Sequence, residues 1–296
     1  MRHKKSVSFA LVTHNRKEEL KECLESILDQ EYSPIEVTVV DNNSNDGTEE
    51  LLRTRYSKPF IHYLKLPENK GTVRGRNISL QMSEGDIIVT LDDDSVLGDR
   101  YATKKIVEKF ESDKDIGVLA FKIINYYPKK ISLKYLPYRK KSLSPNQEFE
   151  TTYFLGCGHA IKREVYETVG FYMDVFFGME ELDLSFRILE AEKKIIFFPE
   201  VKVYHKKSKK GRVPNELEHM LQNRFKVLYR NLPWKYVVVN SLFWTVVILV
   251  KTGSPLTIYR AAKQFFQDFP DIKNQRKVLR SETLKRIKKL KGRLYY

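Results

Sequence analysis

The stretch TLDDDS at residues 90–95 places three consecutive aspartates directly after the apolar residues 86–91. Three carboxylates at the end of a buried strand repel one another, and a hard divalent cation such as Mg²⁺ or Mn²⁺ neutralises them well. The simple alternative is a helix N-cap formed by Asp94 or Ser95, but a cap needs one such residue and not three. We therefore predict a cation site at this strand end, with substrate phosphates completing the ligand shell.

Three other apolar segments also end in polar clusters. THN follows residues 7–12, DNNSNDGT follows residues 35–40 and PENKG follows residues 60–64, with helical spacing between them, as at about 72–82. The alternation of strand and helix patterns predicts an α/β fold with a doubly wound, Rossmann-like sheet that is largely parallel. Ligands of such sheets bind outside the carboxyl ends of the strands, so the four polar clusters are expected to form one pocket.

The common phosphate-binding motifs are absent from the sequence. There is no G-x-x-x-x-G-K-[ST], and GCGHAI at residues 156–161 lacks the third glycine of G-x-G-x-x-G. Neither a P-loop nor a standard dinucleotide site is therefore supported. Any phosphate must therefore be bound in another way, and a cation held by the aspartates could bind it.

Four segments together carry a resemblance to a known family. They are VSFALV through TEELL (7–52), ENKGTVRGRN (68–77), LDDDS (91–95) and GMEELDLSFR through VYH (178–205). In this order and spacing they resemble the family-2 glycosyltransferases of the GT-A fold, from about Val7 to His205. The resemblance implies a doubly wound mixed sheet and an inverting transfer of a sugar from a nucleoside-diphosphate sugar to an acceptor hydroxyl. It also implies a UDP- or dTDP-sugar donor, a glycan or lipid-linked acceptor, and a role in making cell-surface polysaccharide or glycolipid.

The resemblance assigns the donor side to one group of residues. These are Thr13, Asn15, Arg16, Asp41, Asn69, Gly71, Arg76, Asp92 and Asp93. Three alternatives stay open within this group. Asn15 with Glu18 also suits a helix N-cap and its capping box, Asp41 also suits a turn, and Arg74 could take the place of Arg76.

The resemblance also assigns the metal, the base and the acceptor side. Asp94 and His205 are expected to bind the metal, Mg²⁺ or Mn²⁺, while Asp92 contacts the ribose or a metal-bound water. Glu181 takes the place of the general base, one methylene longer than the aspartate usual in the family, and it must come within about 3 Å of the acceptor hydroxyl. The alternative is that Glu180 and Glu181 are only first-turn helix acids. Gly158, Glu180 and Asp183 are expected on the acceptor side.

The chain is expected to divide into two parts. Residues 1–212 form the catalytic domain, with a nucleotide-binding half at about 1–98 and an acceptor half at about 99–212. Residues 213–296 form a helical, basic region. Its apolar stretch at 236–250 would span only about 22 Å as a helix, less than the bilayer core of about 30 Å, which favours interfacial attachment or packing on the catalytic domain over a full span.

Positive charge is concentrated in two places. From Asp271 onwards ten basic residues face two acidic ones, a net charge of +8 out of the chain's +15, and residues 116–147 hold seven basic residues and no acid. Such blocks suit nucleic acid or an anionic membrane surface. The aspartates and the Glu180–Glu181 pair repel nucleic acid, so we expect no nucleic-acid partner, and an anionic membrane surface and a simple solvated face stay open as alternatives.

The remaining observations concern location and the rival function classes. Cys23 and Cys157 are too few and too far apart for a disulfide framework, which indicates a reducing compartment. We expect a cytoplasmic enzyme, with a peripheral position at the inner face of the membrane as an option. A nucleotidyltransferase acting on sugar phosphates is the rival enzyme class, and it would need a glycine- and lysine-rich loop near the N-terminus. A basic nucleic-acid-binding protein is the rival without catalysis.

Overall fold

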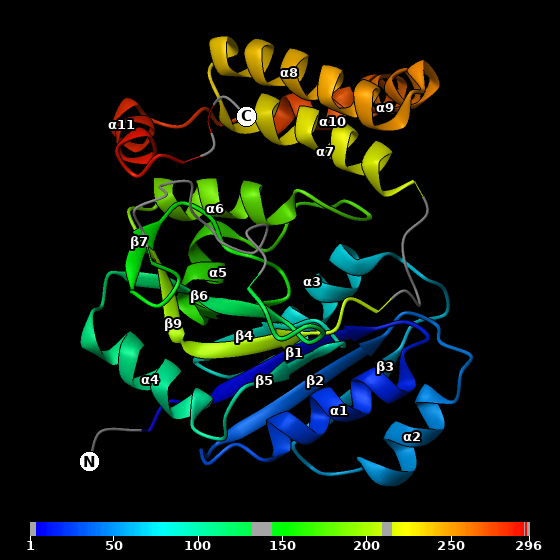
Figure 1. Ribbon diagram of the computed structural model, residues 1–296, viewed down its shortest axis with the longest axis vertical. Coiled ribbons are helices and arrows are strands. Elements are labelled where there is room, and N and C mark those ends of the chain that lie inside the picture. Colours follow the sequence, from blue (N-terminus) through cyan, green and yellow to red (C-terminus); the bar gives the residue numbers. More distant parts are fainter. Residues whose placement is uncertain (1–3, 132–143, 209–214, 293, 295–296) are drawn as a thin grey trace.

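The computed structural model describes residues 4–131, 144–208, 215–292 and 294. Its centre is one nine-stranded sheet with helices on both faces (Figure 1). The strands are β1 (Val7–Thr13), β2 (Ile35–Asp41), β3 (Ile61–Lys65), β4 (Ile87–Leu91), β5 (Ser95–Leu97), β6 (Ile116–Asn125), β7 (Phe149–Thr151), β8 (Gly158–Lys162) and β9 (Lys194–His205). Most of the second basic block, at 132–143, lies outside the described residues.

The sheet is mixed: β1 to β4 form a parallel part, and in the other part antiparallel pairs stand beside the parallel pair of β6 with β9. Its order is β3-β2-β1-β4-β8-β6-β9-β5, with β7 paired to β9. The first four strands are parallel, as their alternation with helices predicts. β8 then runs antiparallel to both β4 and β6. The predicted fold class is confirmed, and the antiparallel pairs are what separates this sheet from a purely parallel one.

Eleven helices are present in the described part of the chain. They are α1 (Lys17–Leu28), α2 (Thr48–Arg55), α3 (Thr72–Met82), α4 (Ala102–Ser112), α5 (Arg163–Val169), α6 (Glu180–Glu190), α7 (Glu216–Asn231), α8 (Trp234–Thr252), α9 (Pro255–Gln267), α10 (Phe269–Asn274) and α11 (Ser281–Lys289). α1, α2 and α4 pack against one face of the sheet, and α3, α5 and α6 against the other.

Alternating side chains of the strands fill two cores. In β1, Phe9 and Leu11 join the core under α1, whereas Ala10 joins the core on the opposite face. The second core continues beyond α6 into the C-terminal region, where Leu228 of α7 and Tyr236 of α8 are buried. The C-terminal helices are therefore stacked on the part of the chain that contains the sheet, as Figure 1 shows for α7 to α10 above α6.

The apolar stretch of the C-terminal region forms α8. It is the one described helix whose length and composition would let it cross a membrane, and 22% of its apolar window is buried in the protein. Several of its other apolar side chains face outwards, among them Leu242 at 64% and Val246 at 59% exposure. Length and composition alone are weak evidence for a span, since core helices pass the same test.

Candidate active site

The candidate metal site is assembled by the pairing of β5 with β9. Ser95 lies opposite His205 in this antiparallel pair, which brings the residues just before β5 to the end of β9. Ligand atoms of Asp92, Asp94 and His205 consequently lie within 4.8 Å of one another. Asp94 Oδ1 is 3.0 Å and Asp92 Oδ2 is 3.8 Å from His205 Nε2. Three residues assigned from sequence to the metal and its bound water therefore come together.

The chemistry of this cluster suits a divalent cation. Oδ1 of Asp94 is buried and receives no well-aligned hydrogen bond from the described residues, while Oδ2 accepts one from the Ser208 amide at 2.7 Å. Burial acts to lower the pKa of His205, but the adjoining Asp94 and the other groups around it raise this pKa to about 12. Such surroundings favour positive charge strongly. Two carboxylates and one imidazole nitrogen are a donor set that Mn²⁺ accepts readily.

Arg16 and Asp93 stand beside this cluster. The Arg16 Nη1 atom is 2.8 Å from Asp93 Oδ1 and 3.8 Å from Asp94 Oδ2. Burial raises the pKa of Asp93 to about 7, and the Arg16 guanidinium opposes the rise. Asp93 thus holds Arg16 beside the aspartates of residues 92–94. The sequence pattern does not indicate this role.

The β1–α1 loop is joined to the β2–α2 loop through Asn15. Its φ is 54°, its side-chain oxygen accepts a hydrogen bond from the Asn45 amide at 2.9 Å, and it makes no cap to α1. In the first turn of α1 the Lys17 amide instead donates a hydrogen bond to Oδ2 of Asp46, at 2.9 Å. The N-cap alternative for Asn15 is therefore wrong, because a neighbouring loop supplies the acceptor.

Asp41 lies at the end of β2 and is completely buried. Its Oδ1 accepts a hydrogen bond from the Ser44 amide at 2.8 Å, and its Oδ2 accepts one from the Tyr63 hydroxyl at 3.0 Å. Thr13, at the end of the neighbouring β1, is also buried and pairs with Asp41 in the register of the sheet. Asp41 therefore orders the turn after β2. The base of a bound nucleotide would have to share the Asp41 oxygens with the Ser44 amide and the Tyr63 hydroxyl.

Gly71, at the start of α3, is required by packing. Its φ is +85°, and a Cβ there would lie 2.5 Å from the carbonyl oxygen of Phe176. Asn69 supports the same turn by accepting a hydrogen bond from the Gly71 amide at 2.9 Å. The close approach predicted for Gly71 is therefore made here by the segment before α6. Arg74, the alternative to Arg76, forms an exposed ion pair with Asp174.

Arg76 connects the aspartate loop with the start of α6. Its Nη2 is 3.0 Å from Asp92 Oδ1 and its Nη1 is 3.3 Å from Glu180 Oε1. The side chain is buried, which acts to lower its pKa, but the surrounding carboxylates, Asp92 first, hold the pKa above its ordinary value. Arg76 is therefore a fixed positive charge between the two acidic parts of the site.

Glu180 and Glu181 differ in their surroundings although they are adjacent. Glu180 is buried and Glu181 is partly exposed. Burial raises the pKa of Glu180 to about 8, with a contribution from Glu181, and burial also raises the pKa of Glu181, which Arg76 opposes. Of the two carboxylates, Glu181 is therefore the more exposed, and the pKa values of both lie above the ordinary value.

Gly156 completes this arrangement and was missed as a site residue. A Cβ at this position would collide with Glu181 Oε1 and lie 3.0 Å from Arg76 Nη1. The signal is the GCG of residues 156–158, in which the sequence analysis assigns a role to Gly158 but none to Gly156. The glycine instead leaves space for the side chains of Glu181 and Arg76.

Two residues expected on the acceptor side, Asp183 and Gly158, each have a packing role in the fold. Asp183 is completely buried, with Oδ2 accepting from Arg187 at 2.9 Å and Oδ1 from Asn231 at 2.9 Å. It therefore joins α6 to α7. Gly158 lies in β8, where a Cβ would come within 2.8 Å of Ile123 Cδ1, so its role is close packing with the neighbouring strand.

Comparisons with known proteins show the family of the chain. The sequence model of glycosyl transferase family 2 matches residues 8–170. An uncharacterised protein of Haemophilus influenzae is 30% identical over 167 residues, which cover 55% of this chain and 90% of that protein. A poly-β-1,6-N-acetyl-D-glucosamine synthase of Staphylococcus aureus is 26% identical over 114 residues, which cover 38% of this chain and only 27% of the synthase.

Solved structures share the fold at low sequence identity. TarS residues 1–349 of S. aureus, in complex with UDP-GlcNAc, gives a TM-score of 0.65 at 16% identity, with 92% of this chain and 84% of that chain covered. The mannosyltransferase PcManGT of Pyrobaculum calidifontis, in complex with GDP-Man and Mn²⁺, gives 0.58 at 18% identity, with 91% and 76% covered. The family match spans more than half of the chain, and this chain belongs to glycosyl transferase family 2.

Proposed function

We propose that the protein is an inverting glycosyltransferase that moves a sugar from a UDP- or dTDP-sugar to a hydroxyl of a glycan or lipid-linked acceptor. The observation that carries the proposal is the chain of charges from Asp92, Asp94 and His205 through Arg76 to the Glu180–Glu181 pair. A cation site next to a fixed arginine suits a nucleoside diphosphate, and a reachable carboxylate with a raised pKa suits an acceptor hydroxyl.

In this proposal the residues of the cluster hold Mg²⁺ or Mn²⁺, with Asp94 and His205 as ligands. A cation bound there would neutralise the charge of the two donor phosphates. Arg76, fixed by Asp92 and Glu180, adds a second positive charge that stabilises the departing diphosphate. The remaining donor-side residues, at the ends of β1 and β2 and before α3, shape the nucleotide pocket.

The transfer itself is a single displacement. The acceptor oxygen forms a bond to the anomeric carbon as the bond from that carbon to the phosphate oxygen breaks. The nucleoside diphosphate leaves with the electron pair, and the proton of the acceptor hydroxyl passes to Glu181. No covalent enzyme intermediate is needed, and the anomeric configuration is inverted. A base whose pKa is raised towards neutrality is effective in such a step.

The biological setting of the proposal is the synthesis of cell-surface polysaccharide or glycolipid. The S. aureus relative is named for making a poly-N-acetylglucosamine, although the match covers a small part of it. The outward apolar side chains of α8 and α9 support a peripheral position at the cytoplasmic face of a membrane. The two helices carry four basic residues and no acidic one, which suits an anionic surface.

A screen of nucleotide sugars for hydrolysis and transfer by the full chain tests the proposal. UDP-, dTDP- and GDP-sugars are incubated with the protein in Mn²⁺ and in excess chelator. We expect release of one nucleoside diphosphate above the rate of spontaneous hydrolysis, and only with the metal. Pyrophosphate release from a nucleoside triphosphate and a sugar phosphate would instead establish the nucleotidyltransferase. The absence of every release would contradict the transferase.

A further inference from the structure

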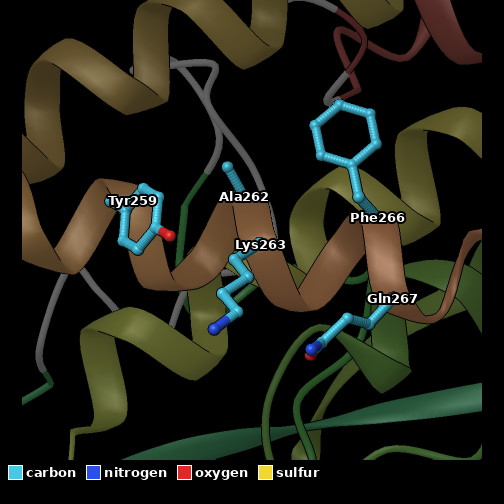
Figure 2. A pocket seen from close by; sticks show the side chains of 5 residues that line it. All are labelled: Tyr259, Ala262, Lys263, Phe266 and Gln267. Carbon is cyan, nitrogen blue, oxygen red and sulfur yellow. The ribbon is translucent and has the colours of Figure 1, made fainter.

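α9 presents two unlike faces. Leu256, Tyr259 and Phe266 are 50%, 61% and 70% exposed on its outer side. Lys263 and Gln267 point to another side of the helix than Phe266, as Figure 2 shows. Together with Tyr259, Ala262 and Phe266 these two residues line a shallow hollow on α9. This hollow is apolar except where Lys263 and Gln267 border it.

A second, polar cavity of 590 Å³ begins where the hollow ends. It lies between the segment 173–176 and helices α7, α9 and α10, and Lys263 and Gln267 line both spaces. Its volume falls in the range of about 300–1,000 Å³ typical of ligand sites. Its walls are rich in amide and carboxylate groups, including Gln222, Asn223, Gln264, Gln267, Asp268 and Gln275.

The polar lining of this cavity suits a saccharide. Amide groups can both donate hydrogen bonds to sugar hydroxyls and accept them, and carboxylate groups can accept them. The wall also contains an aromatic surface, because the rings of Phe176 and His219 stack with centroids 5.7 Å apart. Two of the acids in the wall are already neutralised, since Asp268 is 2.6 Å from Lys226 and Asp174 is paired with Arg74. The cavity is therefore polar without a strong net charge.

The cavity adjoins the proposed active site. Phe176, in its wall, contacts Gly71 at the start of α3 and precedes Glu181 by five residues. Arg230, also in the wall, is 3.1 Å from Asp183 of α6. A molecule in the cavity would thus lie against the segment that leads into Glu180 and Glu181.

Positive charge marks the border between the hollow and the cavity. Arg260 and Lys263 are exposed there, in a helical pair whose sequence from 234 to 267 contains four basic residues and no acid. A cation at the junction of an apolar and a polar surface complements an amphiphile whose chain and sugar are joined through a phosphate.

We propose that the hollow and the cavity together form a binding site for a lipid-linked saccharide with an anionic linkage. The chain lies on Tyr259, Ala262 and Phe266, the phosphate lies at Lys263 and Arg260, and the saccharide occupies the polar cavity. The assignment rests on the proposed glycosyltransferase function and narrows its acceptor to the lipid-linked class.

Titration calorimetry of the full chain with dodecyl phosphate and with dodecyl β-maltoside, both below their micelle concentrations, tests the site. Inorganic phosphate and maltose serve as the chain-free comparisons. We expect each amphiphile to bind at least about tenfold more tightly than its chain-free half, because the dodecyl chain covers apolar side chains.

Variants separate the three parts of the site. Phe266→Ser should weaken both amphiphiles about tenfold, Lys263→Ala should weaken dodecyl phosphate about three- to tenfold, and Gln267→Ala should weaken the maltoside. Lys273→Ala, an exposed change in α10 that lines neither space, should leave all affinities unchanged. Equal affinities in all four variants, or no gain from the dodecyl chain, would overturn the site.

The same samples are titrated with UDP in Mn²⁺. UDP binding without amphiphile binding refutes the acceptor site and leaves the proposed function standing. Amphiphile binding that follows the variants, with no nucleoside diphosphate bound, supports the site and removes the proposed function. Loss of both in the wild-type protein refutes both.

Discussion

Glu180 and Glu181 divide two tasks between neighbouring positions. One oxygen of Glu180 is 3.3 Å from Arg76, and the other is buried and accepts no hydrogen bond from the described residues. Glu181 is partly exposed and has its space secured by Gly156. A buried carboxylate costs free energy unless it is paired or protonated, so Glu180 is suited to holding Arg76 and Glu181 to meeting a substrate.

Replacing the proposed base is the first prediction. Glu181→Gln should lower the rate of sugar transfer about 10²- to 10⁴-fold, because general-base catalysis contributes about that much. UDP affinity in Mn²⁺, measured by calorimetry, should stay within about twofold, since the amide keeps the size of the side chain. Glu164→Gln on the exposed side of α5 is the matched control. Transfer at the wild-type rate would move the base elsewhere.

The pKa of Glu180 gives a prediction for stability against pH. The folded pKa is about 8, above the ordinary value of 4.5, so the folded state retains a proton that the unfolded state releases. Stability is then lost as the pH rises from about 5 to 8, by up to about 1.4 kcal/mol per pH unit.

Glu180→Gln should remove this loss, so that the variant gains stability relative to the wild type as the pH increases. Urea unfolding of both proteins in chelator at pH 5, 6.5 and 8 measures the difference. A free-energy difference that is constant across these three pH values would show that Glu180 does not hold the proton.

Part of the site could be predicted from the sequence and part could not. Asp92, Asp94 and His205 were foreseen because strand ends and the family spacing both pointed to them, and the structure brings them together. The Asp93–Arg16 pair could not be foreseen, because it depends on which way one side chain of three turns. Gly156 could not be foreseen either, since the residues it makes room for are distant in the sequence.

At the scale of elements, α6 is held by its contact with α7. Asp183 of α6 accepts from Arg187 and from Asn231, and Arg230 lies 3.1 Å from it. The family resemblance places Asp183 on the acceptor side, two residues after Glu181. In a helix, positions two apart lie on different sides, and this one turns towards the C-terminal helices.

Removing this carboxylate should cost stability. Asp183→Ala leaves Arg230 and Arg187 without their partner in a buried place, and the expected loss is about 3–5 kcal/mol of unfolding free energy, seen in a urea titration. Glu200→Gln, on an exposed position of β9, should change it by less than about 0.5 kcal/mol. A loss as small as that of the control would mean that α6 is held by its apolar face alone.

The strands of the first half follow directly from the alternation of apolar segments, and each predicted bound lies within one residue of the observed one. The antiparallel strand β8 was not predicted. It is five residues long and is inserted between β4 and β6, which are more than twenty residues apart in the sequence. Local periodicity carries no information on such an insertion.

At the scale of the whole molecule, the charge of the basic tail is not all available to a membrane surface. Arg280 pairs with Glu190 and Glu192, and Arg286 pairs with Glu150, so part of the tail's charge fixes α11 to the catalytic half. The outward apolar surface belongs to α8 and α9 instead. We therefore expect this helical pair to carry any attachment to a membrane, with the tail in a supporting role.

Vesicle binding tests this expectation. The double change Leu242→Glu and Val246→Glu on the outer face of α8 should reduce co-sedimentation with phosphatidylserine-containing vesicles more than about tenfold, because it removes apolar contact and adds negative charge. Val278→Glu, at an exposed apolar residue outside the pair, is the control. Equal sedimentation of the double variant and the wild type would place the attachment elsewhere.

The proposed transfer depends on a cation that is held by Asp92, Asp94 and His205. This cation would join the donor to the protein. Calorimetric titration of UDP into the wild-type protein and into Asp94→Asn, each in Mn²⁺ and in chelator, measures this directly. We predict UDP binding to the wild type that weakens at least about tenfold when Mn²⁺ is removed, and an Asp94→Asn variant that gains nothing from Mn²⁺. Equal UDP affinity under all four conditions would contradict the metal site and the transfer mechanism built on it.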